Sequence, residues 1–413
     1  MSRLRNALLA GTFAGALGLG VAPAAMAQEL SFSQVERGRY LATASDCVAC
    51  HTNIEKDGKR YAGGRGLETP FGTIYSSNLT PDEATGLGRW NRDEFYRALN
   101  EGISRDGSHL YPAMPYPHFT KMSRDDADAI FAYLRTLEPV TAEIPENALP
   151  FPLSIRMSVA GWKLLFFDKV DFAVDPDQSE EWNRGRYLVD ALAHCGACHT
   201  GKNLLGADKE DEYLRGGTLD NWYAPNIRGG VNGGLADWEA EDIVRFLGEG
   251  RSRHTAPMQR MGEVVGLSTQ HLRDEDLMAI AVYLKSLDDA PREEAEAPAQ
   301  ARLETGEAIY FDNCAACHSA DRSGVPDIFA SLESSNKLTA EDPATVIRII
   351  LGGARAQQTE AVPSQIAMPG FAWKLTDQQV ADVVTYLRAV SDRKAGPVSA
   401  GEVEDMREHL EEK

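Results

Sequence analysis

The most constraining feature of this chain of 413 residues is a five-residue pattern, Cys-x-x-Cys-His, that occurs three times. In each copy the two thiols lie three positions apart, which is close to one helical turn, and a histidine follows directly. The copies are Cys47, Cys50 and His51; Cys195, Cys198 and His199; and Cys314, Cys317 and His318. Together they use all six cysteines of the chain. One repeated kind of site therefore accounts for every thiol.

Cys-x-x-Cys-His is typical of the covalent attachment of haem c. Each thiol can form a thioether with one vinyl group of the porphyrin, and the adjacent histidine can bind the iron. A thioredoxin-like pair or simple disulfides would leave the histidines unexplained, and three pairs cannot make whole four-cysteine zinc sites. The sequence therefore predicts three covalently bound haem c groups, with the six cysteines as attachment points and the three histidines as iron ligands.

The other axial ligand of each iron decides between electron transfer and catalysis. A methionine thioether closes the iron to substrates and raises its reduction potential. Met114 and Met368, each followed by proline, are the candidate ligands in the first and third copies. His109 and His118 flank Met114 and could bind iron, but their positions have no counterpart in the third copy, so we expect core or surface roles for them.

The second copy offers two methionines. Met114 lies 67 residues after the first cysteine of its own motif, Met261 lies 66 after its own, and Met258 lies 63. Pro257 beside Met258 resembles the prolines around Met114. The spacing favours Met261 as the iron ligand, and Met258 stays the alternative.

A longer repeat surrounds each motif. A helical segment with a glycine precedes it, at Gly38, Gly185 and Gly306, and a glycine-rich irregular stretch follows. Apolar residues at helical spacing then predict closing helices over Asp126–Leu137, Glu275–Leu287 and Gln378–Val390, each with a Tyr-Leu pair. Ser123 and Thr376 are candidate N-caps. We interpret Trp90 and Trp238 as haem-edge or core packing residues.

The repeat and the composition shifts between its copies predict the organisation of the chain. The expected segments are a signal peptide over 1–27, domains over 28–140, 181–288 and 301–391, linkers over 141–180 and 289–300, and a charged tail over 392–413. The apolar stretch 151–167 could cover the domain interface or dock onto a partner or lipid headgroups. Val403, Met406 and Leu410 could form a narrow apolar stripe in the tail, but we expect a loose, solvated helix there.

The N-terminus carries basic residues, an apolar run over 7–21 and a small-residue cleavage site, as in secretory signal peptides. The expected location is the periplasm, with peripheral contact to the inner membrane as a possibility. A net charge of −20 argues against nucleic acid as a partner, because phosphates would repel the chain.

Longer strings resemble one family. They are "TPFGTIYSSNLTPD" and "GSHLYPAMPYPHF" around the first motif and "EWNRGRYLVDALAHCGACHT" around the second. With the three motifs in order, they resemble the tri-haem cytochrome c subunit of bacterial membrane-associated dehydrogenases, which oxidise alcohols, gluconate or sugar polyols in the periplasm. The resemblance implies an all-α fold of three tandem cytochrome c domains.

The resemblance also implies partners. A separate catalytic subunit with flavin or a quinone cofactor would oxidise the substrate, and this chain would pass electrons towards ubiquinone, a cytochrome or an oxidase. The family often uses an apolar C-terminal segment at the membrane, whereas this tail reads "GEVEDMREHLEEK". Two other readings stay open: a stand-alone periplasmic electron shuttle, and a haem peroxidase, which would need an iron without a stable sixth ligand.

Overall fold

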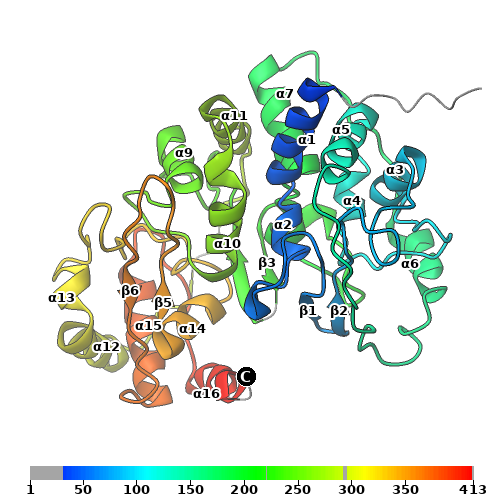
Figure 1. The fold of residues 1–413 in the computed structure, drawn as a ribbon. Coiled ribbons are helices and arrows are strands. Elements are labelled where there is room, and N and C mark those ends of the chain that lie inside the picture. Colours follow the sequence, from blue (N-terminus) through cyan, green and yellow to red (C-terminus); the bar gives the residue numbers. More distant parts are fainter. Residues whose placement is uncertain (1–30, 220, 292–294, 412–413) are drawn as a thin grey trace, which may run out of the picture.

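The computed structural model describes residues 31–219, 221–291 and 295–411, and the expected signal peptide lies outside them. The described chain is mainly helical and contains three similar units, called repeats below (Figure 1). No helix among these residues is long and apolar enough to cross a bilayer.

The first repeat begins with the helix that precedes the first motif and ends with its closing helix. Its elements are α1 (Phe32–Ala44), α2 (Cys47–Cys50), a 3-10 turn (Ile54–Lys56), β1 (Gly66–Thr69), β2 (Gly72–Tyr75), α3 (Arg92–Glu101), α4 (Tyr116–Phe119) and α5 (Arg124–Leu134). A separate helix, α6 (Ser158–Phe166), lies in the connection to the second repeat.

The second repeat has the same order, with α10 in the place of α4, and it adds a π-helical turn and a second 3-10 turn. Its elements are α7 (Glu180–Tyr187), a π-helical turn (Leu188–Leu192), α8 (Gly196–His199), a 3-10 turn (Glu210–Glu212), β3 (Gly216–Leu219), β4 (Trp222–Pro225), α9 (Ala240–Gly248), α10 (Gln259–Leu267), a 3-10 turn (Thr269–His271) and α11 (Asp274–Lys285).

The third repeat is the shortest, and a further helix follows it. Its elements are α12 (Gln300–Asn313), α13 (Ala315–His318), α14 (Ala344–Gly352), β5 (Ala354–Arg355), β6 (Ala367–Met368) and α15 (Asp377–Val390), followed by α16 (Ala400–Glu411).

The first and last helices of each repeat cross at a glycine: α1 packs on α5, α7 on α11, and α12 on α15. A Cβ atom would lie 1.8 Å from the Ala129 carbonyl oxygen at Gly38, and 1.9 Å from that of Ala279 at Gly185. No side chain fits at such distances, so glycine is what lets the backbones touch. The predicted closing helices and the capping roles of Ser123 and Thr376 are confirmed.

The fold is not purely helical. Three antiparallel two-stranded sheets, β1–β2, β3–β4 and β5–β6, occur in the described residues. In the first, Gly66 pairs with Tyr75, and in the second, Gly216 pairs with Pro225. They lie in stretches that the sequence analysis treated as irregular, because strands of two to four residues are too short to show alternation. The all-α expectation therefore holds only in its coarser form, a mainly helical chain.

The residues that the structure describes form two hydrophobic cores. The first and second repeats share one core, in which Ile130 of α5 and Ile280 of α11 are both 2 % exposed. The third repeat has its own core around Ile347 and Val384. In Figure 1 the third repeat, yellow to red, lies to one side of the other two. The first two repeats therefore form one packed unit.

The C-terminal tail is not loose, and that expectation was wrong. Val403 and Met406 of α16 are buried against the core of the third repeat. The Arg407 guanidinium also donates to the Asp377 carboxylate over 2.7 Å. The apolar stripe is narrow, but it meets apolar residues of α14 and α15, and their burial holds the helix in place.

Candidate haem sites

Each Cys-x-x-Cys-His motif forms a single helical turn. The backbone N–H of the histidine donates to the carbonyl of the first cysteine in all three copies, at 2.9 Å for His51 and 3.0 Å for His199 and His318. This turn brings the two thiols of each motif to one side of the helix. All six cysteines are free thiols, as attachment to haem would require.

Four of the six thiols lack the acidity of a redox-active pair. Burial raises the pKa of Cys47, Cys50 and Cys195 to about 12 and that of Cys314 to about 11. A thioredoxin-like pair needs the opposite, a lowered pKa that yields a thiolate. Nor do the described residues contain a group of three or more His, Cys, Asp or Glu placed to hold a metal ion, as a four-cysteine zinc site would require.

The three motif histidines have the same orientation. Their Nδ1 atoms lie 2.6, 2.7 and 2.9 Å from the backbone carbonyls of Ser77, Pro225 and Ala330, respectively. A carbonyl only accepts hydrogen bonds, so Nδ1 carries the hydrogen and Nε2 keeps its lone pair. Burial lowers the pKa of all three imidazoles, which favours the neutral form. A neutral imidazole with a free Nε2 is what an iron ligand needs.

The candidate methionines lie in different settings. Met114 and Met261 pack against the core shared by the first two repeats, and Met368, at the end of β6, packs against the third core. Met258 instead precedes α10, where its backbone forms a β-bridge with Ala356 of the third repeat. This arrangement favours Met261 over Met258, because the Met261 side chain packs against the core of its own repeat.

One buried group fits a bound porphyrin. The Trp238 side chain is 4 % exposed, and its Nε1–H has no acceptor among the residues that the structure describes. Buried N–H groups are nearly always paired, so an unpaired one points to a bound acceptor. Haem propionates are such acceptors. The residues present therefore fit haem.

The first two candidate sites lie close together, which the sequence did not reveal. A Cβ on Gly196, between the cysteines of the second motif, would lie 3.1 Å from Cε1 of His118 in the first repeat. His118 is also paired with Asp208 of the second repeat at 3.1 Å. The expectation of a bland structural role for His118 is thus consistent with a contact between the two repeats.

Arg65 links the same two sites. Its buried guanidinium donates to the Ala49 carbonyl in α2 over 2.6 Å and to the Glu263 carboxylate in α10 over 2.8 Å. It therefore joins the helix of the first motif to the helix that carries Met261. Its position is matched by Arg215 in the second repeat, which pairs instead with Asp289. Sequence repetition could have drawn attention to this arginine but not to its partners.

Helical turns with paired cysteines and carbonyl-oriented histidines, set between crossing helices, define a haem-attaching protein of the c type. The family model described as cytochrome c matches residues 35–138, 183–288 and 303–391, and the chain belongs to the cytochrome c family. Membership of this family implies covalently bound haem c.

The chain is similar to cytochrome subunits of dehydrogenases. It is 38 % identical to the cytochrome c subunit of alcohol dehydrogenase (quinone) from Gluconobacter oxydans, over 93 % of this chain and 84 % of that one. It is 40 % identical to the gluconate 2-dehydrogenase cytochrome c subunit of Pantoea cypripedii, over 90 % and 89 %. It is 35 % identical to the fructose dehydrogenase cytochrome subunit of Gluconobacter japonicus, over 90 % and 82 %.

Proposed function

We propose that this chain is the electron-transfer subunit of a periplasmic dehydrogenase complex. It receives electrons from a catalytic subunit with flavin or a quinone cofactor and passes them to ubiquinone, a cytochrome or an oxidase. One observation carries the proposal: motifs for covalent haem attachment, each with a carbonyl-oriented histidine, occur in a chain similar over most of its length to dehydrogenase cytochrome subunits.

In this proposal the chain holds three haem c groups, one in each of three domains with the boundaries expected from the sequence. The thiols of each motif hold the porphyrin, and His51, His199 and His318 bind the irons through Nε2. Met114, Met261 and Met368 would supply the second protein ligand of each iron. When bound, haem supplies an iron that exchanges one electron with little rearrangement.

The proximity of the first two sites supports electron exchange between them within one packed unit. The third repeat is joined to the second by polar links. The Lys337 ammonium donates to the Thr255 hydroxyl over 2.6 Å, and the Thr359 hydroxyl donates to the Glu249 carbonyl over 2.6 Å. A chain of sites through the molecule suits a relay between two partners.

We also propose peripheral contact with the inner membrane through a surface around α6. Its exposed apolar side chains, here called the α6 surface, are Phe151, Ile155, Met157, Leu164, Leu165, Leu204 and Leu205. The Trp162 Nε1–H donates to the Leu205 carbonyl over 2.9 Å, which ties the turn at 204–205 to the helix. Large exposed apolar clusters of this kind mark interaction sites.

The charge pattern of this segment favours lipid headgroups as the occupant. Residues 147–167 contain no Asp or Glu, in a chain of net charge −20, so this segment carries no carboxylate that would repel anionic headgroups. The opposite side of α6 is occupied: the Tyr116 ring packs edge-on against Phe167 at 5.1 Å. The apolar stretch thus covers the first repeat with one side and leaves the other available.

The function is tested with the full chain, exported in a host that attaches haem. Intact mass should increase by three haem groups, and the chain should co-purify with a dehydrogenase subunit encoded beside it. The purified chain alone should oxidise no alcohol or sugar, but its haems should be reduced when that subunit and its substrate are added. Fewer than three haems, or substrate oxidation by the isolated chain, would contradict the proposal. Purification without any dehydrogenase would favour the stand-alone shuttle.

A further inference from the structure

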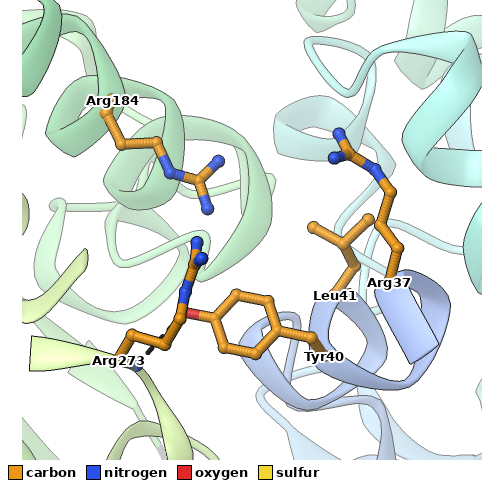
Figure 2. A pocket seen from close by; sticks show the side chains of 5 residues that line it. All are labelled: Arg37, Tyr40, Leu41, Arg184 and Arg273. Atoms are coloured by element: carbon orange, nitrogen blue, oxygen red, sulfur yellow. Dashed lines mark hydrogen bonds between the residues drawn. The ribbon is translucent and has the colours of Figure 1, made fainter. Parts of the chain in front are cut away.

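A cavity of about 400 Å³ opens between the first and second repeats (Figure 2). Its lining is Arg37, Tyr40 and Leu41 of α1, Arg184 of α7, and Arg273 directly before α11. Three of these five side chains are cationic and none is acidic, although the whole chain carries a net charge of −20. In Figure 2, Arg184 and Arg273 reach towards each other on one side, and Arg37 lies across from them.

Two buried carboxylates hold these arginines in place. Arg37 donates to Asp126 through Nε and Nη2, at 3.0 and 2.5 Å, and Arg184 donates to Asp276 through Nε and Nη2, at 2.7 and 2.9 Å. Both carboxylate side chains are at most 4 % exposed. The Nη1 groups of Arg37 and Arg184 have no acceptor among the residues described by the structure. Each therefore keeps N–H donors for a ligand.

The contacts around the cavity form an approximately symmetric pair: each repeat makes to the other the same hydrogen bonds that it receives. The Tyr187 hydroxyl donates to Asp126 over 2.6 Å and accepts from the backbone N–H of Ser123. The Tyr40 hydroxyl likewise donates to Asp276 and accepts from the backbone N–H of Arg273. Arg273 and Ser123 thus occupy equivalent positions, one in each repeat.

Ser123 and Arg273 are where this approximate symmetry fails. Ser123 caps α5 with its hydroxyl, whereas Arg273 is the N-cap of α11 and makes no side-chain cap bond. Serine is favoured at N-caps and arginine cannot replace its acceptor. The Arg273 guanidinium instead pairs with Glu275 at 2.8 Å and with Asp276 at 3.2 Å, and it lies over the Tyr40 ring, 4.9 Å from the ring centroid. It thus adds a third guanidinium to the cavity lining, at a position where the first repeat has a neutral serine.

We propose that this cavity binds a small phosphate-bearing molecule. Guanidinium groups engage phosphate oxygens through paired N–H donors, and three of them on different elements suit a group with several equivalent oxygens. Tyr40 and Leu41 offer an apolar wall to the rest of the ligand. The volume falls within the range of roughly 300–1,000 Å³ that is usual for small-molecule sites. Such a ligand would join the first two repeats, and its binding does not depend on the proposed electron-transfer function.

Inorganic pyrophosphate is the probe, titrated into the full haem-loaded chain by calorimetry at constant ionic strength. We expect binding at one site per chain and a rise in the thermal unfolding midpoint. Arg273→Ser, which installs the residue of the equivalent position, should weaken binding about tenfold or more. The helix cap that serine supplies offsets part of the loss of the Arg273–Asp276 ion pair, so this variant should still fold, and its unfolding midpoint is measured without the probe as well.

Arg39→Ser is the matched control. Arg39 also lies on α1, its side chain is 58 % exposed compared with 59 % for Arg273, and it does not line the cavity. The control removes the same charge and should bind pyrophosphate as the wild-type protein does. Absence of binding to the wild-type chain would overturn the proposal. So would equal weakening by Arg39→Ser, which would indicate only a general charge effect, or unchanged binding by Arg273→Ser.

Discussion

The imidazoles of His51, His199 and His318 are each oriented by a backbone carbonyl, and this shared geometry is the most informative detail at the scale of residues. A histidine with its Nδ1–H committed to a carbonyl presents Nε2 in a defined direction. The same orientation in three separate repeats is unlike the varied partners of ordinary buried histidines. It supports the assignment of all three as iron ligands.

The choice between Met261 and Met258 is the sharpest prediction at this scale. Loss of a thioether ligand opens the iron to carbon monoxide and lowers its reduction potential. Met261→Ala should therefore let one haem of three bind carbon monoxide, measured in difference spectra of the reduced protein. Met258→Ala is the control from the same segment and should not. The reverse pattern would transfer the assignment to Met258.

Buried Asp276 gives a second residue-scale prediction. Although burial opposes its charge, hydrogen bonds from Arg184, Tyr40 and Arg273 lower its pKa to about 2. A pKa below the usual value of about 3.9 means that the carboxylate stabilises the fold above pH 4. This stabilisation is lost as the pH falls towards 2.

Asp276→Asn should therefore lower the free energy of unfolding at pH 7 by about 3 kcal/mol, because it leaves the Arg184 guanidinium uncompensated. The difference from the wild-type protein should narrow between pH 4 and pH 2, as measured by urea denaturation. Glu275→Gln, which changes an exposed neighbouring partner of Arg273, should have little effect at either pH. A difference that stays constant with pH would contradict the assigned role of Asp276.

At the scale of elements, the crossing of α7 and α11 depends on the absence of a side chain at Gly185. A Cβ there would lie 1.9 Å from the Ala279 carbonyl oxygen and 2.9 Å from the Tyr283 Cβ. Backbone atoms of a packed helix cannot move aside cheaply. The helices would have to separate, and that would disturb the core shared by the first two repeats.

We expect Gly185→Ala to lower the free energy of unfolding by about 3 kcal/mol. Gly161→Ala in α6 is the control, since nothing lies within 4 Å of its added methyl group. Because alanine is the better helix former, that variant should be stabilised by up to about 1 kcal/mol. Chemical denaturation of both variants measures the effects. Equal stability of Gly185→Ala and the wild-type protein would show that the crossing is not tight.

The α6 surface is the other element with a testable role. Leu165 and Val231 are 68 % and 67 % exposed, but only Leu165 belongs to the α6 surface. If that surface enters lipid headgroups, Leu165→Ser should weaken binding to vesicles containing phosphatidylglycerol about tenfold. Val231→Ser should leave it unchanged in the same flotation assay. Failure of the wild-type protein to bind such vesicles would refute the membrane contact.

At the scale of the whole molecule, the first two repeats form one unit and the third another, since they have separate cores. The interface within the first unit is built from equivalent residues of the two repeats, as the reciprocal bonds of Tyr40 and Tyr187 show. The third repeat is joined by polar contacts and by the Met258–Ala356 bridge. This arrangement places two candidate haem sites close together within one rigid core.

Much of this organisation could be predicted from the sequence because its causes are local. Haem attachment needs two thiols and a histidine within one helical turn, so Cys47, Cys50 and His51 already define a site. The helix crossing needs a glycine at one position, so the role of Gly38 and Gly185 could be predicted from the sequence. The strands of the hairpins could not be predicted, because two to four residues carry too little periodicity to distinguish a strand from a loop.

The tertiary structure decided what depends on distant partners. The carbonyl that orients His51 belongs to Ser77, 26 residues further along the chain. The sequence around either residue does not predict that the two are hydrogen-bonded. The burial of Val403 and Met406 required the apolar surface of α14 and α15, which a narrow stripe alone does not reveal. The same holds for Arg65 and Arg273: their charge was visible in the sequence, but their place between two repeats follows only from how those repeats pack.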